Sequence, residues 1–168
     1  LFRSEPFMAH FRTKYGDHHD MPPIWMLAEL MPFGRMLTLF KGVEASLQRD
    51  IAQAYRIPDA VLKSWLVVLN VGRNICAHHG RLWNRELGVK PLFPYANKYP
   101  QWHRPVAIPN NRIFAVLTIL RYLLGTIAPT SAWPDRLRNL LARYPEVSTA
   151  SMGFPANWDE SPIWRAGA

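Results

Sequence analysis

Apolar residues recur every three or four positions along most of this 168-residue chain, which is the spacing of one face of an α-helix. The strongest stretches are VLKSWLVVLNV, residues 61–71, and the run from about Asn111 to Ile127. No segment of useful length alternates between apolar and polar residues as a half-buried strand does. The pattern therefore predicts an all-α helical bundle.

Proline and glycine divide this pattern into separate helices. Pro22 and Pro23 start one helix, Pro32 closes it, and Gly80 is a natural terminator for the longest one. The predicted helices cover residues 5–15, 25–30, 35–41, 44–56, 60–79, 111–127 and 134–144. We also allow a further helical turn within residues 81–87.

Two irregular segments accompany the helices. Five prolines between Pro91 and Pro109 predict a long but ordered crossover loop. The tail SMGFPANWDESPIW, residues 151–164, is rich in Pro and Trp, and we expect aromatic packing to hold it. A chain of this length can bury one sizeable core, so residues 1–168 are expected to form a single domain. Because the first residues already read as the middle of a helical pattern, we expect a fragment of a longer protein.

Charge and cysteine content narrow the classes of partner and compartment. The net charge of +8 favours polyanionic partners such as nucleic acid, although an anionic membrane surface fits the same number. Cys76 is the single cysteine, which excludes an internal disulfide framework and a multi-cysteine zinc site. We therefore expect an intracellular, cytoplasmic protein. No apolar run reaches the length of about 18 residues that a membrane helix needs.

Candidate chemistry gathers in GRNICAHHGRLWNRE, residues 72–86, directly after VLKSWLVVLNV, one of the most apolar runs in the chain. On a helix, Asn74 and His78 lie one turn apart and can touch. His79 falls on the apolar side with Trp65 and Cys76, which favours a hydrogen-bonded core histidine and a buried cysteine. His78 is the better candidate for exposed chemistry, with a capping or surface histidine as the open alternative.

The segment also resembles a known motif. RNICAH, residues 73–78, is similar to the Arg-(four to six residues)-His motif of the HEPN domains, the higher eukaryotes and prokaryotes nucleotide-binding superfamily. The longer string RNICAHHGRLWNREL resembles the signature of the Abi-like family of bacterial abortive-infection proteins. Further elements of that resemblance are PFG at 32–34, SW at 64–65, MGFPANW at 152–158 and PIW at 162–164. That family is usually longer at its N-terminus than this chain.

The resemblance implies a helical bundle of the HEPN type and a metal-independent RNA endonuclease. In that family the active site forms where two motif-bearing helices meet, so it implies a homodimer with Arg73 and His78 as catalytic residues. The residue types suit the reaction, because an imidazole can take and give protons near neutral pH and a guanidinium neutralises charge on the phosphorane. Asn74 would support either group. No metal and no cofactor is expected.

Residues just beyond the motif are candidates for RNA binding. Arg81 and Arg85 would contact phosphates, and Trp83 would stack on an unpaired base. For Trp83 and Asn84 a structural role at the edge of the core is an equal alternative, and His79 completes the supporting set.

Other polar clusters carry simpler interpretations. GDHHD, residues 16–20, has metal-ligand residue types, but adjacent ligands rarely converge on one ion, and a polar turn between helices explains the string. His103 is interpreted as a solvated loop histidine. Arg136, Arg138 and Arg143 are interpreted as an ordinary solvated helix face.

The sequence thus gives one leading hypothesis and two alternatives. The leading hypothesis is an RNA endonuclease of a phage-defence or toxin system, with RNA as substrate, no membrane association, and an antitoxin or regulatory partner left open. A non-catalytic RNA-binding or nucleotide-binding module would use the same cationic site without turnover. A partner-binding helical protein would instead tie Arg73 and His78 into salt bridges or helix capping.

Overall fold

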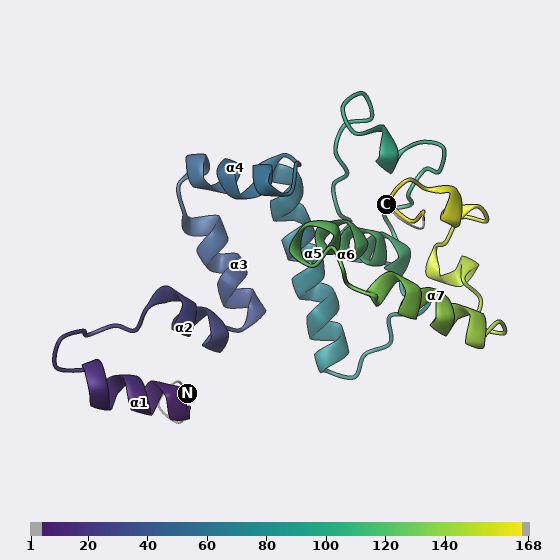
Figure 1. Cartoon of the computed structure of the whole chain (residues 1–168). Helices are drawn as coiled ribbons and strands as arrows, with labels where there is room; N and C mark the ends of the chain where they lie inside the picture. Colours follow the sequence, from purple (N-terminus) through teal and green to yellow (C-terminus); the bar gives the residue numbers. More distant parts are fainter. Residues whose placement is uncertain (1–4, 166–168) are drawn as a thin grey trace. The chain divides into compact units, whose positions relative to one another are not determined.

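The computed structural model describes residues 5–165, and this part of the chain is helical without a strand (Figure 1). Its α-helices are α1 (Pro6–Tyr15), α2 (Ile24–Leu30), α3 (Phe33–Gly42), α4 (Ala45–Ala54), α5 (Asp59–Ala77), α6 (Ile113–Ile127) and α7 (Trp133–Arg143). Short 3-10 turns lie at Pro100–Trp102, Ala150–Met152 and Trp158–Glu160. The all-α fold is confirmed. No described helix has both the length and the apolar character needed to traverse a bilayer.

The predicted helices are all present, with ends displaced by only a few residues. The predictions for 44–56 and 60–79 extend past the observed C-terminal ends at Ala54 and Ala77. The helix predicted over 35–41 begins earlier, at Phe33, and that over 111–127 begins later, at Ile113. Residues 81–87 contain a turn but no helix. The helical turn allowed there is therefore absent, because these residues extend along the core, as described below.

Contacts divide the chain into two compact units, residues 1–42 and 43–168. The first unit contains α1, α2 and α3, and its buried apolar side chains are Met8, Phe11, Leu37 and Phe40. The second unit contains α4 to α7, the crossover loop and the tail. The single domain over 1–168 stays a prediction.

The core of the second unit is built around α5 and α6, which pack against each other (Figure 1). Val68 of α5 is buried with Ile113 and Val116 of α6 and with Leu87, which comes from the segment after α5. Leu82 packs against the same cluster. The chain leaving α5 is thus folded back onto the α5–α6 pair by two leucines.

The crossover loop is ordered, as predicted, and it is fastened to α5. Trp65 is fully buried against Trp102, with ring centroids 4.9 Å apart. The Trp65 indole N–H donates to the carbonyl of Leu92 at 2.7 Å, and the Leu92 N–H donates to the hydroxyl of Ser64 at 2.9 Å. These hydrogen bonds and the ring contact hold the crossover loop against α5, although most of the loop has no regular secondary structure.

Aromatic packing holds the C-terminal tail, which confirms that prediction. Phe154 lies 4.4 Å from Phe114 between ring centroids, and Trp164 is fully buried. The Trp164 indole N–H donates to Thr118 Oγ1 at 2.9 Å, and that hydroxyl donates in turn to the Phe114 carbonyl at 2.8 Å. The described tail is therefore joined to the centre of α6 by both apolar area and a buried hydrogen-bond chain.

The end of α5 has a defined geometry. The N–H of Gly80 donates to the carbonyl of Ile75 at 2.7 Å, and the N–H of His79 donates to the carbonyl of Cys76 at 3.0 Å. This pair of bonds is the Schellman motif, in which one residue takes a left-handed conformation. That residue is His79, with φ of 54°. A position usually filled by glycine is therefore held by a histidine, and α5 stops at Ala77.

Replacing the hydroxyl that receives the Trp164 indole should destabilise the second unit. Thr118→Val keeps the side-chain volume but leaves a buried N–H without an acceptor, so we expect the free energy of unfolding to fall by about 1–3 kcal/mol. Urea unfolding followed by tryptophan fluorescence measures this change. Thr126→Val, at an exposed threonine of the same helix, is the control. Equal losses in the two variants would contradict a role for the Trp164–Thr118 bond.

Relieving the left-handed conformation at the end of α5 should stabilise the protein. His79→Gly removes the Cβ that disfavours φ of 54°, so the free energy of unfolding should rise by about 1 kcal/mol. Ala77→Gly, in the last turn of the same helix, should lower it by about 0.5–1 kcal/mol. Thermal unfolding of both variants tests the assignment, and a loss of stability in His79→Gly would refute it.

Candidate functional site

Arg73, Asn74 and His78 lie together at the C-terminal end of α5, and all three are exposed. Arg73 Nη1 donates to Asn74 Oδ1 at 3.1 Å. Asn74 is bonded to His78 only through the backbone, where the His78 N–H donates to the Asn74 carbonyl at 3.0 Å. The Asn74 side chain therefore orients the guanidinium, and the imidazole that the sequence placed beside it is left open.

His78 is the capping residue of α5, and its ring forms no hydrogen bond or ion pair with any other described residue. The ion pairs found in the described chain, Lys90–Glu86 at 3.8 Å and Arg138–Asp135 at 3.0 Å, include neither Arg73 nor His78. Arg73 and His78 are thus both accessible to a ligand from solution. The alternative in which internal salt bridges occupy them finds no support in the described residues. The alternative of a capping or surface histidine fits the position of His78, which is exposed at the cap of α5.

Two predictions about the interior side of this helix are wrong. His79 and Cys76 are both exposed, although the helical pattern placed them on the apolar stripe with Trp65. His79 has already left the helix, so the helical extrapolation does not apply to it. Cys76 is still helical, but it lies one turn beyond Gly72, the last buried residue of α5. The last turn of α5 therefore extends beyond the segments that cover its apolar face up to Gly72.

Residues 81–87 are positioned by the core and by one arginine. Arg112, the capping residue before α6, donates through Nη1 to the carbonyl of Asn84 at 2.8 Å and to that of Ser151 at 3.1 Å. This contact ties the segment to the C-terminal tail. Arg112 is not predictable as a site residue, because its only signal in the sequence is an arginine directly before an apolar helix.

The supporting residues divide into two groups. Arg81, Asn84 and Arg85 are exposed, so their side chains can contact a ligand. Trp83 is half-buried, and its indole N–H is buried without a hydrogen-bond partner among the described residues. The buried part of the Trp83 ring therefore fits the alternative of a structural role at the edge of the core.

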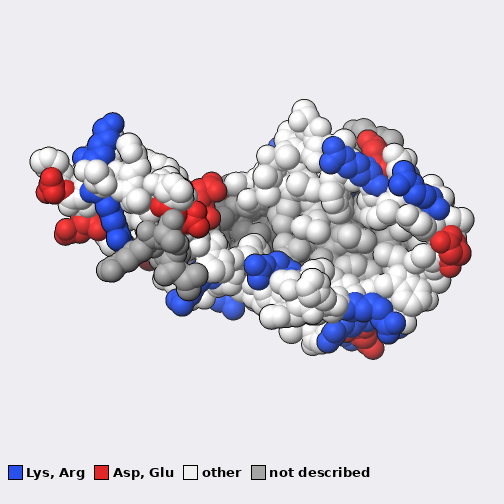
Figure 2. All heavy atoms as spheres, turned by 90° about the horizontal axis from the view of Figure 1, so that it is seen from below, with Lys and Arg blue, Asp and Glu red and all other residues white. Residues whose placement is uncertain are grey.

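Positive charge dominates the sequence from α5 to Arg85. No Asp or Glu occurs in the sequence between Asp59 and Glu86, whereas Arg73, Arg81 and Arg85 all lie within that interval. Figure 2 views the side on which α5 ends, and there the Lys and Arg side chains of the body containing α5 form several separate groups. Uncompensated cations on one loop and one helix end attract a polyanion such as an RNA backbone.

The remaining candidates have other surroundings. GDHHD is exposed, and no group of three or more His, Cys, Asp or Glu able to hold a metal ion occurs among the described residues. His103 is half-buried, with Nε2 2.7 Å from the Pro94 carbonyl oxygen, so it belongs to the crossover loop rather than to solvent. Arg138 also donates to the Trp164 carbonyl, which makes it structural, while Arg136 and Arg143 are exposed.

Comparison with known proteins bears on this site directly. Residues 2–84 match the model of the family described as Abi-like protein, and the matched range includes all of α5 and the segment 73–84. No curated protein and no solved structure matches the chain. The match over the site and over every helix before it shows that the chain belongs to the Abi-like protein family.

Proposed function

We propose that this protein is a metal-independent RNA endonuclease of the HEPN type, acting in a bacterial phage-defence or toxin system. Membership of the Abi-like family supports the link to abortive infection. The observation that carries the enzymatic part is the joint exposure of Arg73 and His78 at the end of α5, with no described carboxylate paired to either.

The reaction uses the 2′-hydroxyl of the RNA as its nucleophile. The 2′-oxygen loses its proton and attacks phosphorus, the bond from phosphorus to the 5′-oxygen breaks, and that oxygen gains a proton. The products are a 2′,3′-cyclic phosphate and a 5′-hydroxyl. His78 carries one of the two proton transfers. Arg73, held by Asn74, binds the non-bridging phosphate oxygens through two parallel N–H groups.

Two proton transfers require two groups, and the motif supplies one imidazole per chain, that of His78. His79 is also exposed, but it lies outside the motif and beyond the end of α5. A two-fold dimer supplies the second His78 and a second Arg73 from an equivalent surface. One imidazole then acts as base while the other acts as acid. Arg81 and Arg85 bind phosphates on either side of the cleaved linkage.

Removing either catalytic group should abolish most of the cleavage. With labelled single-stranded RNA in EDTA, we expect wild-type protein to cut, and His78→Ala to cut at least about a hundredfold more slowly because proton transfer is lost. Arg73→Ala should lose a comparable factor, because it removes charge stabilisation in the transition state. Rates are measured by gel electrophoresis of the fragments.

The matched controls are His18→Ala and Arg136→Ala, which change exposed residues of the same types away from α5. Both should cleave as wild type does. Loss of activity in EDTA, or full activity in His78→Ala, would refute the proposal. Tight RNA binding with the substrate intact would instead favour a non-catalytic binding module.

A composite site makes a further prediction about mixed dimers. Wild-type protein mixed with a fourfold excess of His78→Ala should lose more activity per wild-type chain than dilution with buffer causes, because most wild-type chains then share a site with only one imidazole. The mixture must be allowed to exchange subunits before the assay. Activity per wild-type chain that does not change would show that each chain cleaves alone.

A further inference from the structure

An open groove lies in the second unit, between the turn that follows α4 and the crossover loop. It consists of two adjoining hollows of about 660 and 500 Å³, which share Pro58, Lys98 and Tyr99 in their linings. The lining residues come from within 53–58 and 95–99, and we call this surface the loop groove. Two segments that are distant in the sequence thus form one surface.

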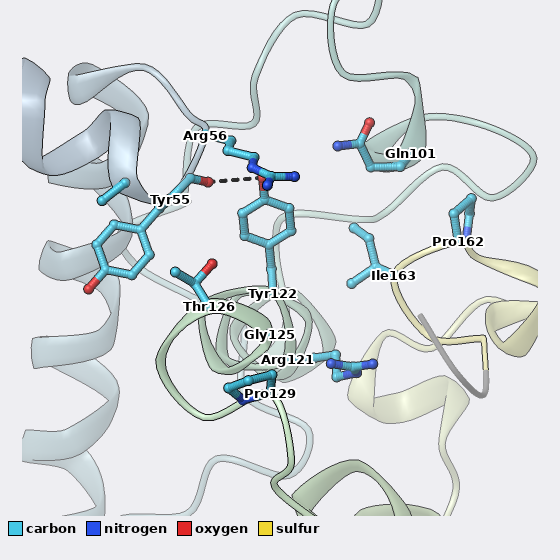
Figure 3. A pocket seen from close by; sticks show the side chains of 11 residues that line it. Tyr55, Arg56, Gln101, Arg121, Tyr122, Gly125, Thr126, Pro129, Pro162 and Ile163 are labelled. Atoms are coloured by element: carbon cyan, nitrogen blue, oxygen red, sulfur yellow. Dashed lines mark hydrogen bonds between the residues drawn. The ribbon is translucent and has the colours of Figure 1, made fainter.

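Hydrogen bonds hold both walls of the loop groove in place. On the helix side, the hydroxyl of Tyr122 in α6 donates to the Tyr55 carbonyl at 3.1 Å, which fixes the turn after α4 (Figure 3). On the loop side, the N–H groups of Lys98 and Tyr99 both donate to the Tyr95 carbonyl, at 3.1 and 3.0 Å. The shape of the groove is therefore set before a ligand arrives.

The loop groove carries positive charge. Arg56 and Lys98 line it, and none of its described lining residues is Asp or Glu. Both side chains are exposed, and neither takes part in an ion pair found in the described chain. Burial raises the pKa of the Tyr122 phenol, Tyr99 adds to that effect and Arg56 opposes it, so the phenol is neutral at physiological pH and leaves the guanidinium charge in place.

Acidic side chains near the loop groove are few. Asp59, directly after Pro58, is half-buried in the first turn of α5, where the N–H groups of the helix stabilise a carboxylate. No Asp or Glu follows it in the sequence before Glu86, whereas Lys63 adds an exposed cation on α5. The groove and the helix that leaves it therefore attract a polyanion.

Aromatic rings complete the loop groove. The side chain of Tyr95 is 81% exposed, and it makes no hydrogen bond or ring contact with another described residue. Tyr99 is half-buried in the same groove, and Asn97 is exposed between the two in the sequence. A flat ring held in solvent beside cations suits an unpaired base, because every base has a face that can stack. The amide of Asn97 can bond the edge of such a base.

The loop groove and the Arg73–His78 surface lie at opposite ends of α5. Pro58 directly precedes this helix and His78 caps it, and its 19 residues give a length of about 28 Å. One stacked strand rises by about 3.4 Å per nucleotide, so about eight nucleotides cover that distance. One RNA strand is therefore long enough to contact both places.

We propose that the loop groove binds a single-stranded segment of the RNA substrate away from the cleaved linkage, with Tyr95 stacking on a base and Arg56 and Lys98 contacting phosphates. This role rests on the proposed function, because it takes RNA as the substrate. The groove shares no residue with the Arg73–His78 surface. It contributes to affinity for the RNA and takes no part in the proton transfers.

Binding of an RNA that cannot be cleaved tests this role without any need for activity. The probe is a fluorescent 2′-O-methyl oligoribonucleotide of 12 nucleotides without self-complementarity, titrated with the full chain and followed by anisotropy. Tyr95→Ala should raise the Kd at least about fivefold, because the stacked base is lost. Lys98→Gln should raise the Kd and weaken its dependence on salt concentration, because one phosphate contact is lost.

The matched controls are Tyr144→Ala and Arg136→Gln, which change exposed residues at α7. Both should bind the probe as wild type does. An unchanged Kd in both Tyr95→Ala and Lys98→Gln would overturn the loop groove, and so would no binding of the probe by wild-type protein. Equal affinity for a blunt RNA duplex of the same length would also overturn it, because paired bases do not stack on a tyrosine.

Cleavage kinetics separate this role from the proposed chemistry. With a cleavable RNA of the same length, Tyr95→Ala and Lys98→Gln should raise KM and leave kcat as it is, whereas His78→Ala lowers kcat. Unaltered KM and Kd in an active enzyme would overturn the loop groove alone. A Kd that depends on Tyr95 and Lys98 in a protein that does not cleave would overturn the endonuclease alone.

Discussion

The return of the chain after α5 is the constraint on which the proposed active site depends. Leu82 and Leu87 draw residues 81–87 back onto Val68 and the first turn of α6, and Arg112 fixes the same segment through the Asn84 carbonyl. The helix must stop for this reversal to occur. His79 takes the left-handed conformation that stops it, and the side chains of the last turn remain in solvent.

In this arrangement α5 contributes one half to the apolar core and its other end to the proposed active site. The same helix is buried at Trp65 and Val68, and from Arg73 onward its residues are exposed except for the half-buried Ile75. A rigid interior half anchors an exposed end that bears a guanidinium, an amide and an imidazole. In the mechanism that we propose, such anchoring keeps the imidazole of His78 at a fixed distance from the guanidinium of Arg73, which is what rate enhancement by positioning requires.

Much of the fold follows from the spacing of apolar residues and from proline and glycine. Helix existence, the ordered crossover loop and the tail held by its tryptophans are all predictable, because each depends on local pattern or on large apolar area. His79 and Cys76 show where that logic ends. Their exposure depends on which segments cover the last turn, and helical register does not encode this. The segment that follows packs through Leu82 and Leu87 against Val68 and α6. Arg56, directly after α4, is a second example. Its left-handed backbone conformation accompanies hydrogen bonds at the helix end that the spacing of apolar residues does not encode.

The central claim is that Arg73 and His78 contact one ribose-phosphate linkage together. The most direct measurement is NMR of the Arg73 guanidinium and the His78 imidazole during titration with a 2′-O-methyl oligoribonucleotide, which binds as RNA but cannot be cleaved. The account predicts that both resonances shift with one shared saturation curve, while the His18 imidazole does not move. Saturable binding that leaves Arg73 and His78 unperturbed would contradict it.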